Sequence, residues 1–93
     1  DYDNLLYLIA GEIVKRVSGM TWEDFVAKRI FTPLKMDRSG AAIDRIKDTN
    51  NLAVPHSSDG GKLKQLDHFK PMINGAAGGI HSNVSDMCLW MLA

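Results

Sequence analysis

The sequence contains a single cysteine, Cys88, and carries no net charge, and both features exclude classes of protein. One cysteine forms no internal disulfide, so cysteine usage indicates neither an oxidising nor a reducing compartment. Eleven basic residues are balanced by eleven acidic ones, which leaves no field to attract nucleic acid or an anionic membrane. No stretch reaches the run of about 18 apolar residues that a membrane-spanning helix needs.

Motifs for metal, nucleotide and sugar chemistry are also missing. The three histidines are not spaced like zinc ligands on a helix. The Gly-rich turn, which we define as residues 74–79, is followed by Ile80-His81-Ser82 rather than by the Gly-Lys-Ser/Thr of a phosphate-binding loop. No pair of carboxylates follows a glycosidase pattern. We therefore expect no metal and no cofactor.

The 93 residues suffice for one small domain, and an apolar content of 45% is ordinary for a globular chain. The sequence has no initiator methionine, begins within a motif and stops within a predicted helix. We therefore expect residues 1–93 to be a single partial domain of a longer protein. Any export signal would precede residue 1, so the compartment stays open, and a periplasmic or secreted parent is compatible with the sequence.

The strongest helix pattern runs from Leu5 to Val17, where apolar residues recur at steps of three and four. Asp3 or Asn4 can serve as its N-cap, and Gly19 can take the left-handed position after its last turn. Gly11 lies in mid-helix with no turn residues around it, so we interpret it as a point of close packing.

A second helix is predicted to begin at Thr21 and to end before Pro33. Thr21 is followed three residues later by Asp24, a shortened capping box. One face of this helix is expected to pack on the first helix and consists of Trp22, Phe25, Val26, Arg29 and Ile30. The short connection makes residues 4–34 a helical hairpin.

The rest of the chain is predicted to be less regular. Residues 37–51 are polar and form a surface loop with one brief helical or 3₁₀ turn. Within residues 52–66, Leu52, Val54 and His56 alternate with Ala53 and Pro55, and the turn tripeptide Asp59-Gly60-Gly61 follows. This pattern predicts a β-hairpin, in which Pro55 confines its strand to the edge of a sheet. The Gly-rich turn allows another backbone to approach closely. A mainly α fold with a small β-hairpin follows.

The final helix is predicted over residues 84–93. Asn83 and Asp86, three residues apart, are typical of a capped helix start. Apolar side chains then recur at helical spacing, and we expect them to form a buried face of Val84, Met87, Cys88, Met91 and Leu92. Cys88 is accordingly interpreted as a small buried hydrophobe rather than as a nucleophile.

Tyr2 and Asn4 are the candidate catalytic residues, because they lie two positions apart where the first helix begins. A phenol can act as general acid or base when a nearby cation lowers its pKa. A carboxamide can orient a substrate carbonyl and a lysine through its acceptor and donor atoms. The alternative is purely structural, with a buried tyrosine and a capping asparagine.

Three stretches together resemble the serine β-lactamase-like, penicillin-binding hydrolases, a family that includes class C β-lactamases, DD-carboxypeptidases and esterases. They are YDNLLYLIAGEIVKRVSGMTWEDFVAKRIFTPLKM at 2–36, AVPHSSDGGKL at 53–63 and AAGGIHSNVSDMCLWML at 76–92. Their order is similar to the segment that begins at the family's Tyr-x-Asn motif. The resemblance implies a helical subdomain fragment of the α+β β-lactamase/transpeptidase-like fold.

The resemblance also implies roles for Tyr2 and Asn4. In the family pattern the serine of a Ser-x-x-Lys motif attacks an acyl carbonyl and forms an acyl-enzyme, the tyrosine and lysine move its proton, and the asparagine holds lysine and substrate. This chain contains no Ser-x-x-Lys, no Lys-Thr-Gly and no His-x-Gly. We therefore expect it to be inactive alone, within a parent that acts on an amide, lactam or ester.

A non-catalytic helical interaction module, or a pseudoenzyme piece in which Tyr2 and Asn4 only pack, is the competing hypothesis. His81 beside the Gly-rich turn is expected either to line a cleft of the longer protein or to lie at the surface. The expected partner is a small-molecule or peptide acyl substrate of the parent. The apolar helix faces would normally meet the rest of such a hydrolase, so we expect the isolated chain to expose them and to self-associate.

Overall fold

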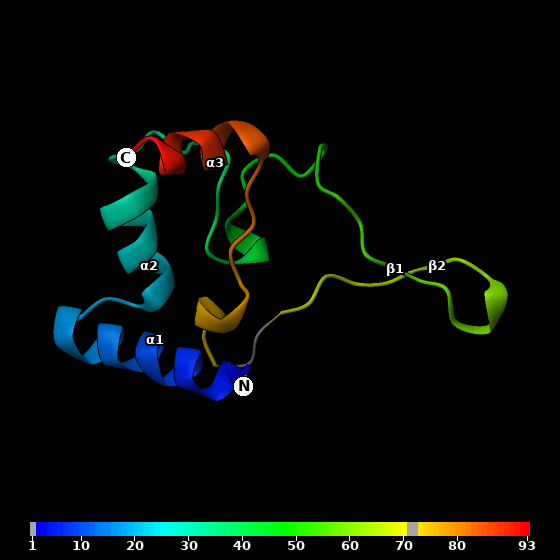
Figure 1. Cartoon of the computed structure of the whole chain (residues 1–93), viewed down its shortest axis with the longest axis horizontal. Helices are drawn as coiled ribbons and strands as arrows, with labels where there is room; N and C mark the ends of the chain where they lie inside the picture. The colour runs from blue at the N-terminus through cyan, green and yellow to red at the C-terminus, as the bar shows by residue number, and fades with distance from the viewer. Residues whose placement is uncertain (1, 71–72) are drawn as a thin grey trace.

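The computed structural model describes residues 2–70 and 73–93, and its principal elements are helices (Figure 1). In chain order they are α1 (Asn4–Ser18), α2 (Trp22–Val26), the π-helical turn η1 (Ala27–Phe31), the 3₁₀ turn η2 (Ile43–Arg45), β1 (His56–Ser57), the turn η3 (Asp59–Gly61), β2 (Lys64–Gln65), the 3₁₀ turn η4 (Gly75–Ala77) and α3 (Val84–Met91). The fold is mainly α with a small β-hairpin, as the sequence predicts.

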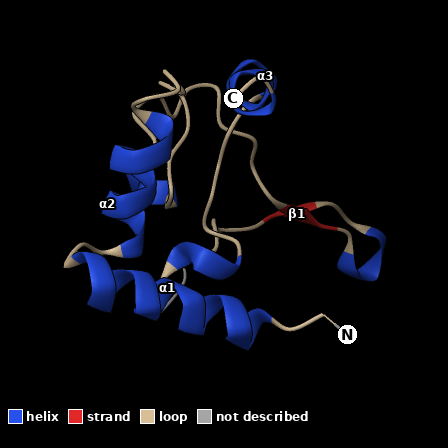
Figure 2. Ribbon diagram, turned by 60° about the vertical axis from the view of Figure 1, so that its left-hand side comes forward, coloured by secondary structure: helices blue, strands red, loops and turns tan. Residues whose placement is uncertain are grey.

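Capping residues set the ends of the first two helices. The Asp3 side chain is the N-cap of α1, and Gly19 ends it with a φ of 70° in the left-handed region. The Thr21 side chain caps α2 by accepting a hydrogen bond from the Asp24 N–H. The Asp24 carboxylate accepts in turn from the Thr21 hydroxyl at 2.8 Å, so the shortened capping box is formed. The helices meet at a corner that Figure 2 shows clearly.

The hydrophobic core is small and lies between α2, η1 and the loop that follows them. Its buried members are Val26, Phe31, Met36 and Ala41, with Trp22, Ala27, Ile30 and Leu34 packed against them. The predicted packing face of the second helix therefore contributes Trp22, Val26 and Ile30, while Arg29 is exposed and lies over the Phe25 ring.

The chain segment before α3 pairs with the loop after η1. Gly40 and His81 form an antiparallel bridge with two backbone hydrogen bonds of 2.9 Å. Asp86 of α3 is 5% exposed, and its carboxylate accepts hydrogen bonds from the Arg38 N–H at 3.0 Å and the Ser39 hydroxyl at 2.7 Å. These contacts attach α3 to the loop through polar groups.

The prediction of a buried apolar face on the final helix is wrong. Asn83 is the N-cap as expected, but Asp86 is the buried residue of α3, and Cys88 is exposed rather than a buried hydrophobe. The predicted face is exposed at every position: Val84, Met87, Cys88, Met91 and Leu92. Helical periodicity indicates which residues share a face but not which face meets a neighbour, and hydrogen bonding of the Asp86 carboxylate turns the polar side inward.

The β-hairpin has two residues in each strand, with His56 opposite Gln65 and Ser57 opposite Lys64. It projects away from the helices (Figure 1). The ladder is short because Pro55 has no N–H to donate. One more bond joins the Leu66 N–H to the Pro55 carbonyl at 2.8 Å.

The molecule is extended, and much of its apolar surface is exposed. The radius of gyration is 14.9 Å, against about 12 Å for a compact domain of this length. The exposed apolar residues of α1 form a stripe, which we call the α1 stripe: Leu5, Leu6, Ile9, Ile13 and Val17. The predicted exposure of an apolar helix face is thus confirmed for α1, whereas the face of α2 packs into the core. Within the described ranges, every helix is too short or too polar to cross a bilayer.

Candidate active site

The N-terminus of α1 leaves the side chain of Asn4 available. Asp3, rather than Asn4, is the N-cap, and its carboxylate accepts the Leu5 N–H at 2.7 Å. Asn4 is therefore the first residue of the helix, and its carboxamide is not used for capping. Tyr2 precedes the cap and is 82% exposed. The structural alternative for this pair, a buried tyrosine and a capping asparagine, is wrong on both counts.

Asn4 lines a groove of about 300 Å³ between α1 and the Gly-rich turn, which we call the Asn4 groove. A volume of this size lies at the lower end of the range typical of small-molecule sites. Most of its wall is apolar, and none of the described residues that line it is charged. The lining residues are Asn4, Leu8, Phe69, Ile73, Asn74, Ala77, Gly78 and Gly79. Tyr2 is outside this set, so the structure places one candidate on the groove and the other in solvent before the helix.

One face of α1 faces the groove and the Gly-rich turn. Asn4, Leu8 and Gly11 follow one another at helical spacing, i, i+4 and i+7. Gly11 is buried, and a Cβ at its position would lie 2.7 Å from the Asn74 Oδ1 and 2.8 Å from the Ala76 Cβ. The interpretation of Gly11 as a close-packing point is confirmed. The α1 stripe lies on the other side of the helix, so the groove side of α1 consists of Asn4, Leu8 and Gly11.

Asn74 ties the Gly-rich turn to α1. Its Nδ2 donates to the Leu8 carbonyl at 3.0 Å, and its Oδ1 accepts from the Ala76 N–H at 3.0 Å. Sequence reasoning missed this residue. The signal was an asparagine directly before a glycine-rich turn, a position where its side chain can cap the turn's N–H groups.

Gly75 ties the same turn to α2. Its N–H donates to the Glu23 Oε1 at 2.8 Å, and a Cβ at this position would lie 2.6 Å from the Ala41 carbonyl oxygen. Gly79 also lies close to Ala41, since a Cβ at its position would lie 2.9 Å from the same oxygen. The predicted close approach of another backbone to this turn is confirmed, and the absence of side chains at both glycines is what permits it.

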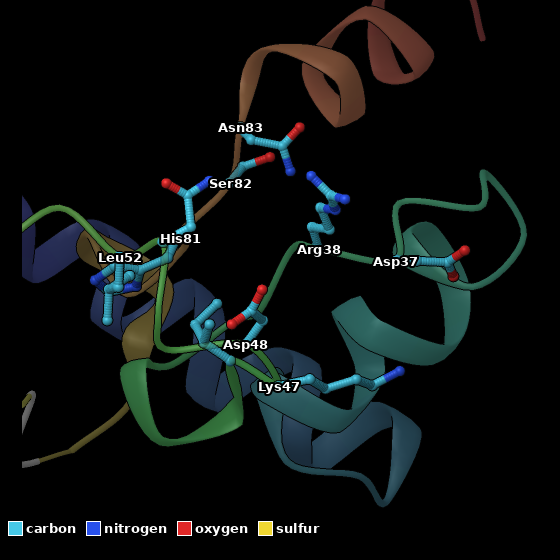
Figure 3. A pocket seen from close by; sticks show the side chains of 10 residues that line it. Asp37, Arg38, Lys47, Asp48, Leu52, His81, Ser82 and Asn83 are labelled. Carbon is cyan, nitrogen blue, oxygen red and sulfur yellow. The ribbon is translucent and has the colours of Figure 1, made fainter.

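A second cavity, next to His81, is a weaker candidate for substrate binding. It measures about 110 Å³, below the size typical of small-molecule sites. Figure 3 shows Arg38 extending from its loop toward Asn83 at this cavity. His81 is half-buried, and its Nδ1 lies 2.9 Å from the Gly79 carbonyl oxygen. His81 thus lines this cavity rather than the Asn4 groove.

The described residues contain no cluster of three His, Cys, Asp or Glu side chains that could hold a metal ion. The best-defined ion pair joins Arg45 to Asp24 at the start of α2. The hydrogen bond from Arg45 lowers the pKa of Asp24, with a smaller contribution in the same direction from the Thr21 hydroxyl. This pair stabilises the helix start and lies away from the Asn4 groove.

Comparison with known proteins identifies the family of this chain. The sequence model of the Beta-lactamase family matches residues 1–93, so the chain belongs to that family. The predicted resemblance is confirmed.

A solved structure supports the assignment: the octameric penicillin-binding protein homologue from Pyrococcus abyssi is 30% identical, with a TM-score of 0.78. The alignment covers 97% of this chain and 20% of that one, so the 93 residues span a fifth of the homologue's length. The fold is therefore a fragment of the penicillin-binding protein fold. No curated protein sequence matches the chain.

Proposed function

We propose that this chain supplies Tyr2 and Asn4 to the acyl-transfer site of a longer serine hydrolase, which acts on an amide, lactam or ester. The observation that carries the proposal is the position of Asn4, which lines the Asn4 groove and whose carboxamide does not serve as the helix N-cap. Membership of the Beta-lactamase family supports the same role. The competing proposal, a non-catalytic module, draws support from the exposed apolar surface.

The chemistry follows from the residue types. The serine hydroxyl attacks the acyl carbonyl, its proton passes to a base, and the amine or alcohol leaves with a proton as the acyl-enzyme forms. Water then hydrolyses the ester and restores the serine. Tyr2 moves the proton between the serine and the leaving group, together with the lysine of Ser-x-x-Lys, and Asn4 orients that lysine and the substrate carbonyl.

Because the chain contains neither Ser-x-x-Lys nor Lys-Thr-Gly or His-x-Gly, the 93 residues alone turn over no substrate. We expect a fluorescent penicillin to label no serine within them. Labelling of one of these serines would contradict the proposal.

The test uses the full-length protein with nitrocefin and p-nitrophenyl esters as substrates. We expect Tyr2→Phe to lower kcat about 10²- to 10⁴-fold, the contribution of a general acid–base group. Asn4→Ala should lower kcat/KM about 100-fold through lost orientation. Tyr7→Phe is the matched control, because Tyr7 is an exposed phenol on the same helix.

Rates that stay unchanged in both Tyr2→Phe and Asn4→Ala would reject the catalytic role and favour the non-catalytic module. A full-length protein without a Ser-x-x-Lys motif would reject it as well. A substrate preference between lactam and ester follows from the same assays.

We also propose that the isolated 93-residue chain self-associates through its exposed apolar faces. The homologue from Pyrococcus abyssi is described as octameric, which is consistent with assembly in this family. The main support is the α1 stripe, which is solvent-exposed in the chain.

A further inference from the structure

Asn74 uses both ends of its carboxamide to join the Gly-rich turn to α1. The Nδ2 donates to the Leu8 carbonyl, while the Oδ1 accepts from the Ala76 N–H, each at 3.0 Å. Only a side chain with a donor and an acceptor on one planar group can make both bonds from this position. An aspartate keeps the acceptor and loses the donor.

The bond to α1 is made one helical turn from Asn4. Leu8 follows Asn4 by four residues, so the two lie on one face of the helix, and both line the Asn4 groove together with Asn74. The wall that the rest of the Gly-rich turn contributes to the groove is Ala77, Gly78 and Gly79. The distance between Asn4 and that wall is therefore set where Asn74 meets the helix.

The Gly-rich turn has a second, independent attachment on its other side. Gly75 donates to Glu23 of α2, and the backbone before α3 pairs with Gly40. Loss of the Asn74 bond to Leu8 thus removes the hydrogen bond that fixes the turn against α1, while the packing at Gly11 and the attachments to α2 and the loop remain. The expected consequence is a change in groove geometry rather than loss of the fold.

We propose that Asn74 is a positioning residue of the acyl-transfer site, which sets the place of the Gly-rich turn relative to Asn4. This inference rests on the proposed function, because Asn74 acts through Asn4. Asn74 lies 70 positions after Asn4 in the sequence, so the proposal adds a distant segment to the site that contains Tyr2 and Asn4.

The first experiment is Asn74→Asp in the full-length protein, since aspartate has nearly the same shape. We expect kcat/KM to fall about 10- to 100-fold, because a displacement of about 1 Å near reacting groups costs up to about 100-fold. The urea midpoint should stay close to that of the wild type. Asn50→Asp, an exposed asparagine in the loop, is the matched control and should leave both values unchanged.

The decisive measurement is the double variant Asn4→Ala with Asn74→Asp. If Asn74 acts through Asn4, the double variant has the same kcat/KM as Asn4→Ala alone, because the group being positioned is gone. Effects that multiply would show two independent contributions and overturn the inference. An unchanged kcat/KM in Asn74→Asp would also overturn it.

The two proposals fail in distinguishable ways. If Asn4→Ala alone has no effect, the proposed function fails and the positioning role fails with it. If Asn4→Ala is impaired and Asn74→Asp is not, only the positioning role fails. Should Asn74→Asp not accumulate, Asn74→Ser, which keeps a short acceptor for the Ala76 N–H, enters the same double-variant test. Failure of both variants to fold would assign Asn74 a purely structural role and overturn the inference.

Discussion

Gly11 lies where α1 has no room for a side chain. In an exposed helix, replacing glycine by alanine stabilises by about 1 kcal/mol. Here the added Cβ would meet the Asn74 Oδ1 at 2.7 Å. Crowding of this kind costs about 1–3 kcal/mol, so the contact outweighs the helix propensity.

We therefore expect Gly11→Ala to lower the free energy of unfolding, measured by urea denaturation. Ala10→Gly, at the exposed neighbouring position, is the control and should cost about 1 kcal/mol from propensity alone. A Gly11→Ala variant more stable than the wild type would show that the Gly-rich turn does not press on α1.

The lowered pKa of the Asp24 carboxylate makes the stability of the fold depend on pH. Its pKa is lowered from 3.8, first by the hydrogen bond from Arg45 and then by that from Thr21. A carboxylate with a lowered folded-state pKa stabilises the fold above its unfolded pKa, and this contribution is lost as the pH falls through the folded pKa. Both partners are solvent-exposed, so the effect is small.

We expect Asp24→Asn to lower the urea midpoint at pH 7, and we expect the difference from the wild type to shrink as the pH falls below 3.8 and through the lowered pKa of Asp24. Asp67→Asn, another exposed aspartate, should show no such loss. A difference that grows on acidification would contradict the assignment.

At the scale of elements, α3 is attached by a buried charge rather than by an apolar face. Asp86 accepts hydrogen bonds from the Arg38 N–H and the Ser39 hydroxyl, and the Ser39 hydroxyl also lies 2.8 Å from that of Ser82. Removing the carboxylate leaves these donors without their acceptor in a buried place. Hydrogen bonds to a charged group contribute about 1.5–3 kcal/mol each.

We expect Asp86→Ala to destabilise the protein by about 2–3 kcal/mol in urea denaturation. Ser85→Ala, at the exposed neighbouring position of α3, should change stability little. Equal stability of the two variants would mean that α3 is held by other contacts.

The β-hairpin is the element in which prediction and structure differ most in extent. The alternating pattern predicts residues 52–66, and the strands cover two residues each. Gly60 and Gly61 both have positive φ, which is the turn chemistry that Asp-Gly-Gly predicts. Two strands without backing pair only weakly in water, so the turn forms while the ladder stays short.

At the scale of the whole molecule, four buried apolar side chains form the core in the part of the chain that the structure describes, while many more apolar side chains are exposed. Contiguous exposed apolar patches are typical of surfaces that bind protein. The chain spans a fifth of the length of the penicillin-binding protein homologue. A longer polypeptide offers a cover for the α1 stripe, and the isolated chain lacks it.

We expect the isolated 93-residue chain to show an average mass above that of a monomer by light scattering, rising with concentration. Ile13→Glu, within the α1 stripe, should shift the mass toward the monomer. Lys15→Gln changes the net charge by the same amount outside the stripe and is the control. A monomer at all concentrations would contradict self-association.

The helix starts and ends, the turn chemistry, the close-packing glycine and the family could all be read from the sequence, because each depends on residues that are near one another in the chain. Asp3, Thr21, Asn83 and Gly19 act on backbone groups within four residues of themselves. The motif order that indicates the Beta-lactamase family is likewise linear.

Only the tertiary structure decided which helix face is buried and which residues meet at the groove. The bond from Asn74 to Leu8 spans 66 positions and that from Arg38 to Asp86 spans 48. Periodicity cannot predict such pairings, since it gives the residues of a face but not the partner. The α1 stripe and the α3 face are regular apolar faces that nevertheless lie in solvent. The groove side of α1 is joined to the Gly-rich turn by the bond from Asn74 to Leu8, and the Asp86 side of α3 is joined to the loop after η1.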